Sequence, residues 1–395
     1  MKRLAAVLTV GLIFLTGCRA GRKPEQPGSQ PEPAASPPPA NTTYEETAPG
    51  QPLTLLMDGN QWSCQGTENG YYDIVSCPDG SQLIYYTDYE KRIQFPLCAA
   101  PNCAHSGPEC TAWTTANGLF VYQEKVYQFQ IPDKTSPCLE QMELDGSGKK
   151  ELLRLQKGQE FAASGVAAAG DLLYYITNET QTVQGELMTT SQLNRLNLRT
   201  GENRVIQSME GLNQFIVGAV KDRLLLKRFQ VDRQSGSYGM PEFLLMDQAG
   251  GEEPIALPEF VDAFTWICPE GERLVIVNSS ESSVVSMDLN TGVCETLVTD
   301  PLFGRYPGQV LISTVQGNNL IVNLAADYYL CTGGNLKPSV HSYYSGLNRG
   351  NRILAQVEGQ YLVCRDFDTV HKTLALIDQQ DYWQDLDTDV VIQNS

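Results

Sequence analysis

The chain has 395 residues, of which 42% are hydrophobic, and a formal net charge of -18 at pH 7. So acidic a protein is not expected to bind nucleic acid or to adhere electrostatically to anionic lipid, because both need clustered Lys and Arg. The apolar content suffices for a large core, and the length allows either two average domains or one large repetitive domain.

The first 18 residues combine a basic start, an apolar run and a cysteine. The apolar stretch from Leu4 to Leu15 is too short to span a bilayer comfortably and suits the apolar region of a secretory signal. The sequence Leu-Thr-Gly-Cys that ends at Cys18 resembles the bacterial lipobox, in which the cysteine is acylated and becomes the mature N-terminus. We expect residues 1–17 to be a lipoprotein signal peptide. Cys18 would then carry several acyl chains, such as palmitate, which anchor the protein stably at the cell membrane. An ordinary signal peptide with an incidental cysteine is the alternative.

Residues 18–52 read as a tether. The stretch is rich in Pro, Ser, Gln, Ala and Thr, and it contains almost nothing that could build a core. In polyproline geometry it would reach roughly 100 Å, at about 3.1 Å per residue. We therefore predict a disordered segment that holds the folded part, residues 53–395, away from the membrane on its extracytoplasmic face.

The loop at residues 95–113, FPLCAAPNCAHSGPECTAW, contains the most distinctive local cluster. Cys98, Cys103, His105 and Cys110 form a C-x4-C-x-H-x4-C pattern. Three thiolates and one imidazole would satisfy zinc in a closed, tetrahedral structural site with no open position for water. The spacing is not that of a standard zinc finger or zinc knuckle.

Disulfides are the alternative for this loop. Its cysteines could pair with Cys64, Cys77 or Cys138, which an oxidising exterior allows. The ten cysteines that follow Cys18 are an even number, which favours full pairing. Paired cysteines would be as inert as those in a closed metal site, and His105 would then be a surface residue.

A four-strand unit is clearest at residues 264–300. Its short apolar segments are separated by turns that contain Gly271, a Ser-rich stretch and Gly292, which predicts an antiparallel meander. The second segment, Leu274 to Val277, is apolar on both faces, whereas a sheet with one face in water would alternate polar and apolar residues. This sheet therefore needs a packed neighbour on each side.

Similar units recur along the chain. The turn glycines lie about 40 to 55 residues apart, the period of propeller blades, at Gly146, Gly201, Gly251 and Gly292. The predicted second strands number about seven, at 83–86, 119–122, 172–176, 224–226, 274–277, 320–324 and 361–364. Either the strand 53–57 or the final 390–392 would complete a blade that begins at the other end of the chain.

These turns resemble a known type of repeat. The segments CPDGSQL (77–83) and CPEGERL (268–274), with the Asp-Leu-x-Thr-Gly turn near Gly292, are similar to the WD-like repeats of TolB-type propellers over most of residues 66–386. The chain also resembles tethered propeller lipoproteins of Gram-positive gut bacteria, many without an assigned activity. Similar cysteine loops occur in those lipoproteins, whose hosts are often anaerobes, and this favours the metal. The resemblance implies an all-β propeller of seven four-stranded antiparallel blades.

Two common catalytic motifs are absent from the sequence. His105, His341 and His371 are the only histidines, and neither H-E-x-x-H nor G-x-S-x-G occurs. No catalytic residue is therefore predicted, and the expected function is a binding or scaffold module for an envelope protein, peptide or glycan across one end of the propeller channel. The alternative is an envelope polysaccharide hydrolase or lyase, with carboxylates, tyrosines, His341 or His371 at the channel mouth. A purely structural surface protein is the third hypothesis.

Overall fold

The computed structural model describes residues 50–58, 63–77, 79–132, 135–183, 186–230, 239–324, 327–339, 353–367, 372–386 and 388–394. The signal peptide, Cys18, the tether, His341 and His371 lie outside these residues. Within the described ranges, no helix has the length and apolar character that a membrane crossing requires.

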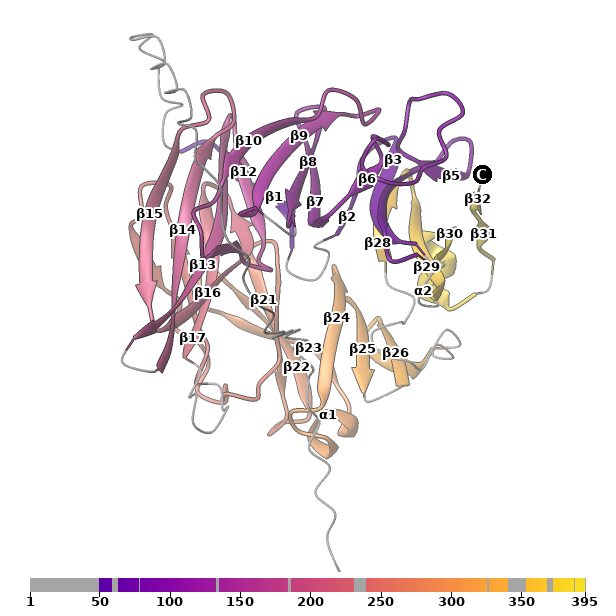
Figure 1. The fold of residues 1–395 in the computed structure, drawn as a ribbon. Helices are drawn as coiled ribbons and strands as arrows, with labels where there is room; N and C mark the ends of the chain where they lie inside the picture. Colours follow the sequence, from indigo (N-terminus) through magenta and orange to yellow (C-terminus); the bar gives the residue numbers. More distant parts are fainter. Residues whose placement is uncertain are drawn as a thin grey trace, which may run out of the picture. The chain divides into compact units, whose positions relative to one another are not determined.

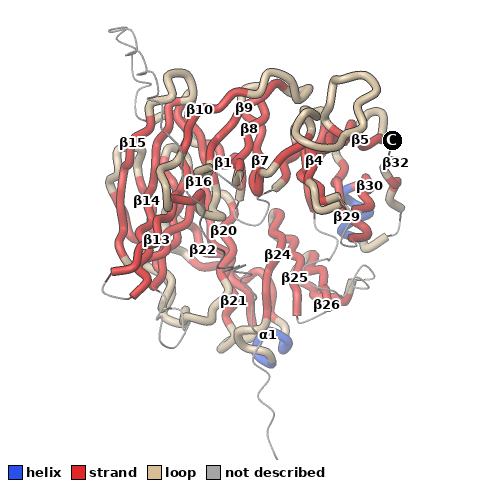
Figure 2. The backbone as a smooth tube through the Cα atoms, in the orientation of Figure 1, coloured by secondary structure: helices blue, strands red, loops and turns tan. Residues whose placement is uncertain are grey.

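The described strands form seven sheets, the seven blades of a propeller (Figures 1 and 2). Blade 1 contains β2 (Cys64–Gly66), β3 (Gly70–Ser76), β4 (Gln82–Asp88) and β5 (Ile93–Pro96), with β6 (Trp113–Thr114) paired to β4. Blade 2 contains β7 (Ala116–Tyr122), β8 (Lys125–Gln130), β9 (Cys138–Glu143) and β10 (Lys150–Arg154). Blade 3 contains β12 (Val166–Ala169), β13 (Leu172–Val183), β14 (Glu186–Asn197) and β15 (Asn203–Glu210), together with β1 (Thr54–Met57) and β11 (Gln159–Phe161).

The second half of the chain repeats this pattern more regularly. Blade 4 contains β16 (Leu212–Val220), β17 (Arg223–Gln230), β18 (Glu242–Met246) and β19 (Glu252–Pro254). Blade 5 contains β20 (Ile267–Glu270), β21 (Arg273–Asn278), β22 (Ser283–Asp288) and β23 (Cys294–Thr299), and the short helix α1 (Pro301–Arg305) follows it. Blade 6 contains β24 (Val310–Gln316), β25 (Asn319–Leu324), β26 (Asp327–Thr332) and β27 (Asn335–Pro338). Blade 7 contains β28 (Ile353–Val357), β29 (Gln360–Phe367), β30 (Lys372–Asp378) and β31 (Val390–Val391), with α2 (Gln379–Gln384) before β31.

Blade 5 shows why the sequence folds into blades. Leu274 and Ile276 of β21 pack into the core shared with blade 4, and Val275 and Val277 pack into the core shared with blade 6. All four side chains are at most 5% exposed. Because successive side chains of a strand point to opposite faces, a strand that is apolar on both faces stabilises two interfaces at once, by about 1.5–3 kcal/mol for each large side chain. The seven-bladed, all-β architecture predicted from the sequence is confirmed.

The innermost strands lie side by side around the ring. β2 lies beside β7, β7 beside β1, β1 beside β16, β16 beside β20, and β20 beside β24. The ring returns to its start because β28 of blade 7 also lies beside β2 of blade 1. In Figure 1 the indigo strands of blade 1 are therefore next to the yellow strands of blade 7.

Of the two segments that could complete a blade at the other end of the chain, the strand 53–57 does not do so. β1 pairs antiparallel with β12 inside blade 3, where Thr54 lies opposite Ala168. The C-terminal segment closes the ring instead. β31 is the fourth strand of blade 7, and β32 (Gln393–Asn394) then pairs in parallel with β5 of blade 1.

Two of the predicted second strands occupy other positions within their blades. Residues 83–86 lie in β4, the third strand of blade 1, and residues 119–122 lie in β7, the first strand of blade 2. The two Cys-Pro turns are consequently not equivalent, since Cys77 follows β3 whereas Cys268 lies in β20. In blade 4 the left-handed turn residue is Gly250, with φ of 100°, and not Gly251.

Candidate metal centre and candidate ligand pocket

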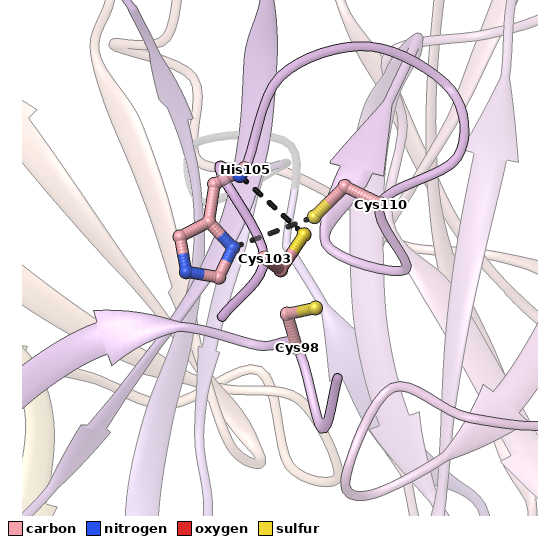
Figure 3. A group of neighbouring side chains, drawn as sticks. All are labelled: Cys98, Cys103, His105 and Cys110. Carbon is pink, nitrogen blue, oxygen red and sulfur yellow. Dashed lines mark hydrogen bonds between the residues drawn. The ribbon is translucent and has the colours of Figure 1, made fainter. Parts of the chain in front are cut away.

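The long loop between β5 and β6 brings Cys98, Cys103, His105 and Cys110 together (Figure 3). One ligand atom of each residue lies within 4.8 Å of the ligand atoms of the other three. The predicted convergence of these four residues is therefore present, and the cluster could hold a metal ion.

Both ends of this loop are attached to β4. The backbone N–H of Leu97 donates to the Ile84 carbonyl at 2.8 Å, and the Ile84 N–H donates to the Ala112 carbonyl at 2.8 Å. Between these points the chain turns sharply, because Asn102, His105 and Gly107 all have positive φ angles of 59°, 52° and 76°. The two anchors and the tight turns fold the loop back on itself, which directs its cysteines inward.

The distances between the ligand atoms of the cluster are compatible with a bound metal ion. The His105 N–H donates to Cys103 Sγ at 3.4 Å, and Cys110 Sγ lies 3.5 Å from His105 Nδ1 (Figure 3). With zinc–sulfur and zinc–nitrogen bonds of about 2.3 Å and 2.0 Å at a tetrahedral angle, sulfur and nitrogen would be about 3.5 Å apart. The observed spacing fits such an ion.

The thiols differ in their electrostatic surroundings. Burial raises the pKa of Cys98, but hydrogen bonds from Thr111, Ala100 and the neighbouring thiols outweigh it and lower that pKa to about 6. Burial raises the pKa of Cys110, which is 2% exposed, to about 11. The lowered pKa favours the thiolate of Cys98, the form that binds metals. A bound dication would favour the thiolate at the other two cysteines as well.

The surroundings of the cluster bear on the disulfide alternative. Cys98, Cys103 and Cys110 carry free thiols in the structure. Among their suggested partners, Cys77 packs in the same small apolar cluster, whereas Cys64 lies in β2 and Cys138 in β9. A disulfide would use two sulfurs at a time and would give His105 no role.

A second candidate site is a cavity of about 540 Å³ at the inner strands of blades 3 to 7. Its walls are largely apolar and aromatic, with a few polar and charged groups. The residues that define its character are Phe215, Lys227, Phe229, Phe243, Trp266, Cys268, Glu270, Ile312, Gln316, Gln356, Asp58 and Ser164. Sequence reasoning did not identify this site. The one local signal is a lysine within the apolar run of β17.

Aromatic rings surround Lys227. In the register of blade 4, Lys227 lies opposite Phe215 of β16 and opposite Phe243 of β18. The rings of Phe215 and Phe229 are stacked, with centroids 5.5 Å apart and planes 11° from parallel. Lys227 Nζ lies 5.8 Å from the centroid of Phe229 and 5.9 Å from that of Phe243. Desolvation lowers the pKa of Lys227 from its ordinary value.

Two other groups that line this cavity are the Cys268 thiol and the Glu270 carboxylate. Burial raises the pKa of the Cys268 thiol to about 12, and the nearby Glu270 and Asp58 contribute to this rise, so the thiol is neutral at physiological pH. Glu270 accepts a hydrogen bond of 2.6 Å from Arg273 Nε. The neutral Cys268 thiol is therefore not an activated nucleophile.

Comparison with known proteins gives the fold and no family. No protein-family model and no curated protein matches the sequence. A puromycin hydrolase mutant in complex with PGG is 9% identical, with a TM-score of 0.50 over 88% of this chain and 56% of that protein. Oligogalacturonate lyase from Vibrio parahaemolyticus is 11% identical, with a TM-score of 0.48 over 84% of this chain and 94% of that one. TolB from Acinetobacter baumannii is 13% identical, with a TM-score of 0.32 over 69% and 64%. At such identities these likenesses do not extend to activity.

Proposed function

We propose that this protein is a lipid-anchored propeller on the extracytoplasmic face of the cell membrane, and that it binds a peptide, a glycan or a segment of an envelope protein. In this proposal residues 1–17 are the signal peptide, Cys18 carries the lipid, and residues 18–52 are the tether. The observation that carries the binding role is the cavity whose wall includes Phe215, Phe229 and Trp266. Concave, mainly apolar pockets with a few polar groups are the usual form of ligand sites.

Truncation of the aromatic wall tests the binding role. In calorimetric titrations with a panel of envelope-derived oligosaccharides and peptides, Phe215→Ala and Trp266→Ala should each weaken binding about fivefold or more, because a stacking ring contributes roughly 1 kcal/mol or more. Phe264→Ala is the matched control, since Phe264 is 79% exposed and does not line the cavity. Equal affinities for the wild type and all three variants would place the binding site elsewhere.

The hydrolase or lyase is kept as the second candidate because Asp58 and Glu270 line the same cavity. Two carboxylates flanking a glycosidic bond are the common requirement of glycoside hydrolysis. The same oligosaccharides, incubated with the protein and assayed for new reducing ends and for unsaturated products, should remain intact. Turnover that is lost in Glu270→Gln would replace the binding role with the enzyme.

The anchor is tested at Cys18. Cys18→Ala should release the mature protein from the membrane fraction, because the acylated residue is removed. Retention of a normally cleaved Cys18→Ala protein in that fraction would contradict the lipid anchor.

We also propose that the metal of the Cys/His cluster is zinc, held by Cys98, Cys103, His105 and Cys110 as a structural staple. Four protein ligands leave no open coordination position, so the ion would order the loop and supply no reaction. The support is the 3.5 Å spacing of Cys110 Sγ and His105 Nδ1, together with the convergence of all four groups.

Metal content and stability test this assignment. Native mass spectrometry should find one zinc per chain, and removal by a chelator should lower the melting temperature. Cys110→Ser should abolish the bound zinc, whereas Cys294→Ser is the matched control, because Cys294 is exposed and outside the cluster. A metal-free protein that is lighter by two hydrogens per bridge, with the mass restored by reductant, would replace zinc with disulfides. Free, readily alkylated thiols without metal would exclude both staples.

A further inference from the structure

We propose that the cavity takes an apolar ligand with a single carboxylate, and that Lys227 binds this carboxylate between the rings of Phe215, Phe229 and Phe243. The inference rests on the proposed binding function and specifies the chemistry of its ligand. It begins from the position of Lys227, which is half-buried on the strand face that also carries the core residue Leu225.

β17 supplies the first observation. Leu225 points to the same face of the strand as Lys227, is 0% exposed, and belongs to the core between blades 4 and 5. Phe243, which lies opposite Lys227 on the next strand, is 2% exposed and belongs to the same core. Placing a lysine at the end of this apolar strand face costs desolvation free energy, whereas Leu or Met would not incur that cost.

The second observation is that, in the part of the chain that the structure describes, the Lys227 ammonium makes no ion pair or hydrogen bond. Its contacts there are with the rings of Phe229 and Phe243. Glu270, one of the carboxylates that line the cavity, is already bound to Arg273. Cation–π contacts contribute about 0.5–2 kcal/mol and offset only part of the cost. The lowered pKa of Lys227 agrees, because its cause is desolvation.

The third observation concerns the other polar groups of the wall, which are bonded to the protein itself. Ser164 Oγ accepts from the Ile216 N–H at 2.8 Å, and Trp266 Nε1 donates to the Ile312 carbonyl at 3.0 Å. Gln316 Nε2 donates to Gln356 Oε1 at 3.1 Å. A sugar needs many hydrogen-bonding partners for its hydroxyl groups, and this wall offers few. Besides these groups the wall offers apolar surface and the Lys227 ammonium, which match an apolar carboxylate such as the C-terminus of a peptide that ends in an aromatic residue.

A pair of probes that differ only in charge tests this inference. Calorimetric titration of the mature protein with N-acetylphenylalanine and with N-acetylphenylalanine amide should show at least tenfold tighter binding of the acid. Lys227→Met should remove this preference by weakening the acid at least tenfold and the amide less than twofold. Lys157→Met is the matched control, an exposed lysine outside the cavity, and should leave both affinities unchanged.

The outcomes separate this inference from the binding function on which it rests. Equal binding of the acid and the amide by the wild type would mean that the carboxylate is not recognised, with the cavity remaining the binding site. The same conclusion would follow if Lys227→Met bound both ligands as the wild type does while Phe215→Ala lost both. If Phe215→Ala and Lys227→Met both bind the acid as the wild type does, the cavity itself is wrong. Failure of the acid to bind any of the proteins also overturns the inference, whereas the oligosaccharide and peptide panel still tests the cavity. Comparison of N-acetylphenylalanine with a longer peptide that ends in phenylalanine distinguishes a free acid from a peptide terminus.

Discussion

Arg228, the neighbour of Lys227 in β17, shows how the same strand satisfies a buried cation when no ligand is needed. Its guanidinium is 4% exposed and donates to both carboxylate oxygens of Glu252, from Nη1 at 3.0 Å and from Nη2 at 2.6 Å. Gln214 and Gln207 accept two further hydrogen bonds of 2.6 Å. Four acceptors therefore replace the water that Arg228 loses, whereas Lys227 has none among the described residues.

The Arg228–Glu252 pair predicts a pH-dependent contribution to stability. The hydrogen bond from Arg228 is the main reason that the pKa of Glu252 is lowered. A carboxyl group with a lowered pKa in the folded state stabilises the fold above its ordinary, unfolded pKa, and this contribution is lost as the pH falls through the folded pKa. Glu252→Gln should therefore lower the free energy of unfolding at pH 7 by about 2 kcal/mol.

The control for this prediction lies one residue away. Glu253 also pairs with an arginine, Arg223, but its side chain is 70% exposed, so Glu253→Gln should cost well under about 1 kcal/mol. Urea unfolding at pH values from about 7 down to about 3 measures both variants. The difference between the wild type and Glu252→Gln should shrink as the pH falls below about 4.5, the ordinary pKa of Glu. A constant difference would contradict the ionic origin.

At the scale of elements, β1 is an added inner strand that joins three blades. Leu56 and Met57 pack into the core between blades 2 and 3, and Leu53 packs into the core between blades 3 and 4. The first described strand after the predicted tether is thus part of the core, although it does not close the ring. Its removal would open two interfaces at once.

A single truncation tests this role of β1. Leu56 is 7% exposed, so Leu56→Ala should lower the free energy of unfolding by about 2–4 kcal/mol through lost burial and the cavity left behind. Val205→Ala in the same blade is the control, because Val205 is 51% exposed and should have little effect. Chemical denaturation measures both variants. An unchanged midpoint for Leu56→Ala would mean that β1 is a peripheral strand.

At the scale of the whole molecule, the C-terminal segment holds the ring closed. Ile392 is 4% exposed and shares a core cluster with Tyr71 of blade 1 and Leu374 of blade 7. Its backbone N–H donates to the Leu374 carbonyl at 2.8 Å, and the next N–H, that of Gln393, donates to the Arg92 carbonyl at 3.0 Å. One short segment therefore connects the last blade to the first.

If the C-terminal segment holds the ring closed, substitutions at the neighbouring residues Ile392 and Val391 should change stability unequally. Ile392→Ala should destabilise the protein by about 2–4 kcal/mol and lower the melting temperature, because the lost methyl groups lie between two blades. Val391→Ala, one residue earlier and 45% exposed, should be close to neutral. Thermal unfolding compares them. Equal melting temperatures for the two variants would show that the ring stays closed without this contact.

The sequence alone was sufficient to predict features formed by residues that lie close together in the chain. The strands of blade 5 lie within one short stretch of the chain, and the run from Leu274 to Val277 requires a neighbour on each face because it is apolar on both. The Cys/His cluster was predictable for the same reason, because Cys98 and Cys110 belong to one loop. Hydrophobic periodicity and the spacing of metal ligands involve residues that are close together in the chain, so both can be recognised in the sequence.

Only the tertiary structure decided which distant segments meet. Phe215, Trp266 and Ile312 come from three different parts of the ring, and no spacing in the sequence marks them as the wall of one cavity. The partner of β1 was equally hidden, and the choice between the two ends of the chain for closing the ring stayed open. A short apolar strand can hydrogen-bond to any sheet edge, and backbone hydrogen bonds carry no information on the partner's identity. The choice among those edges depends on how side chains from several blades pack together, which is a property of the closed ring and not of any segment within it.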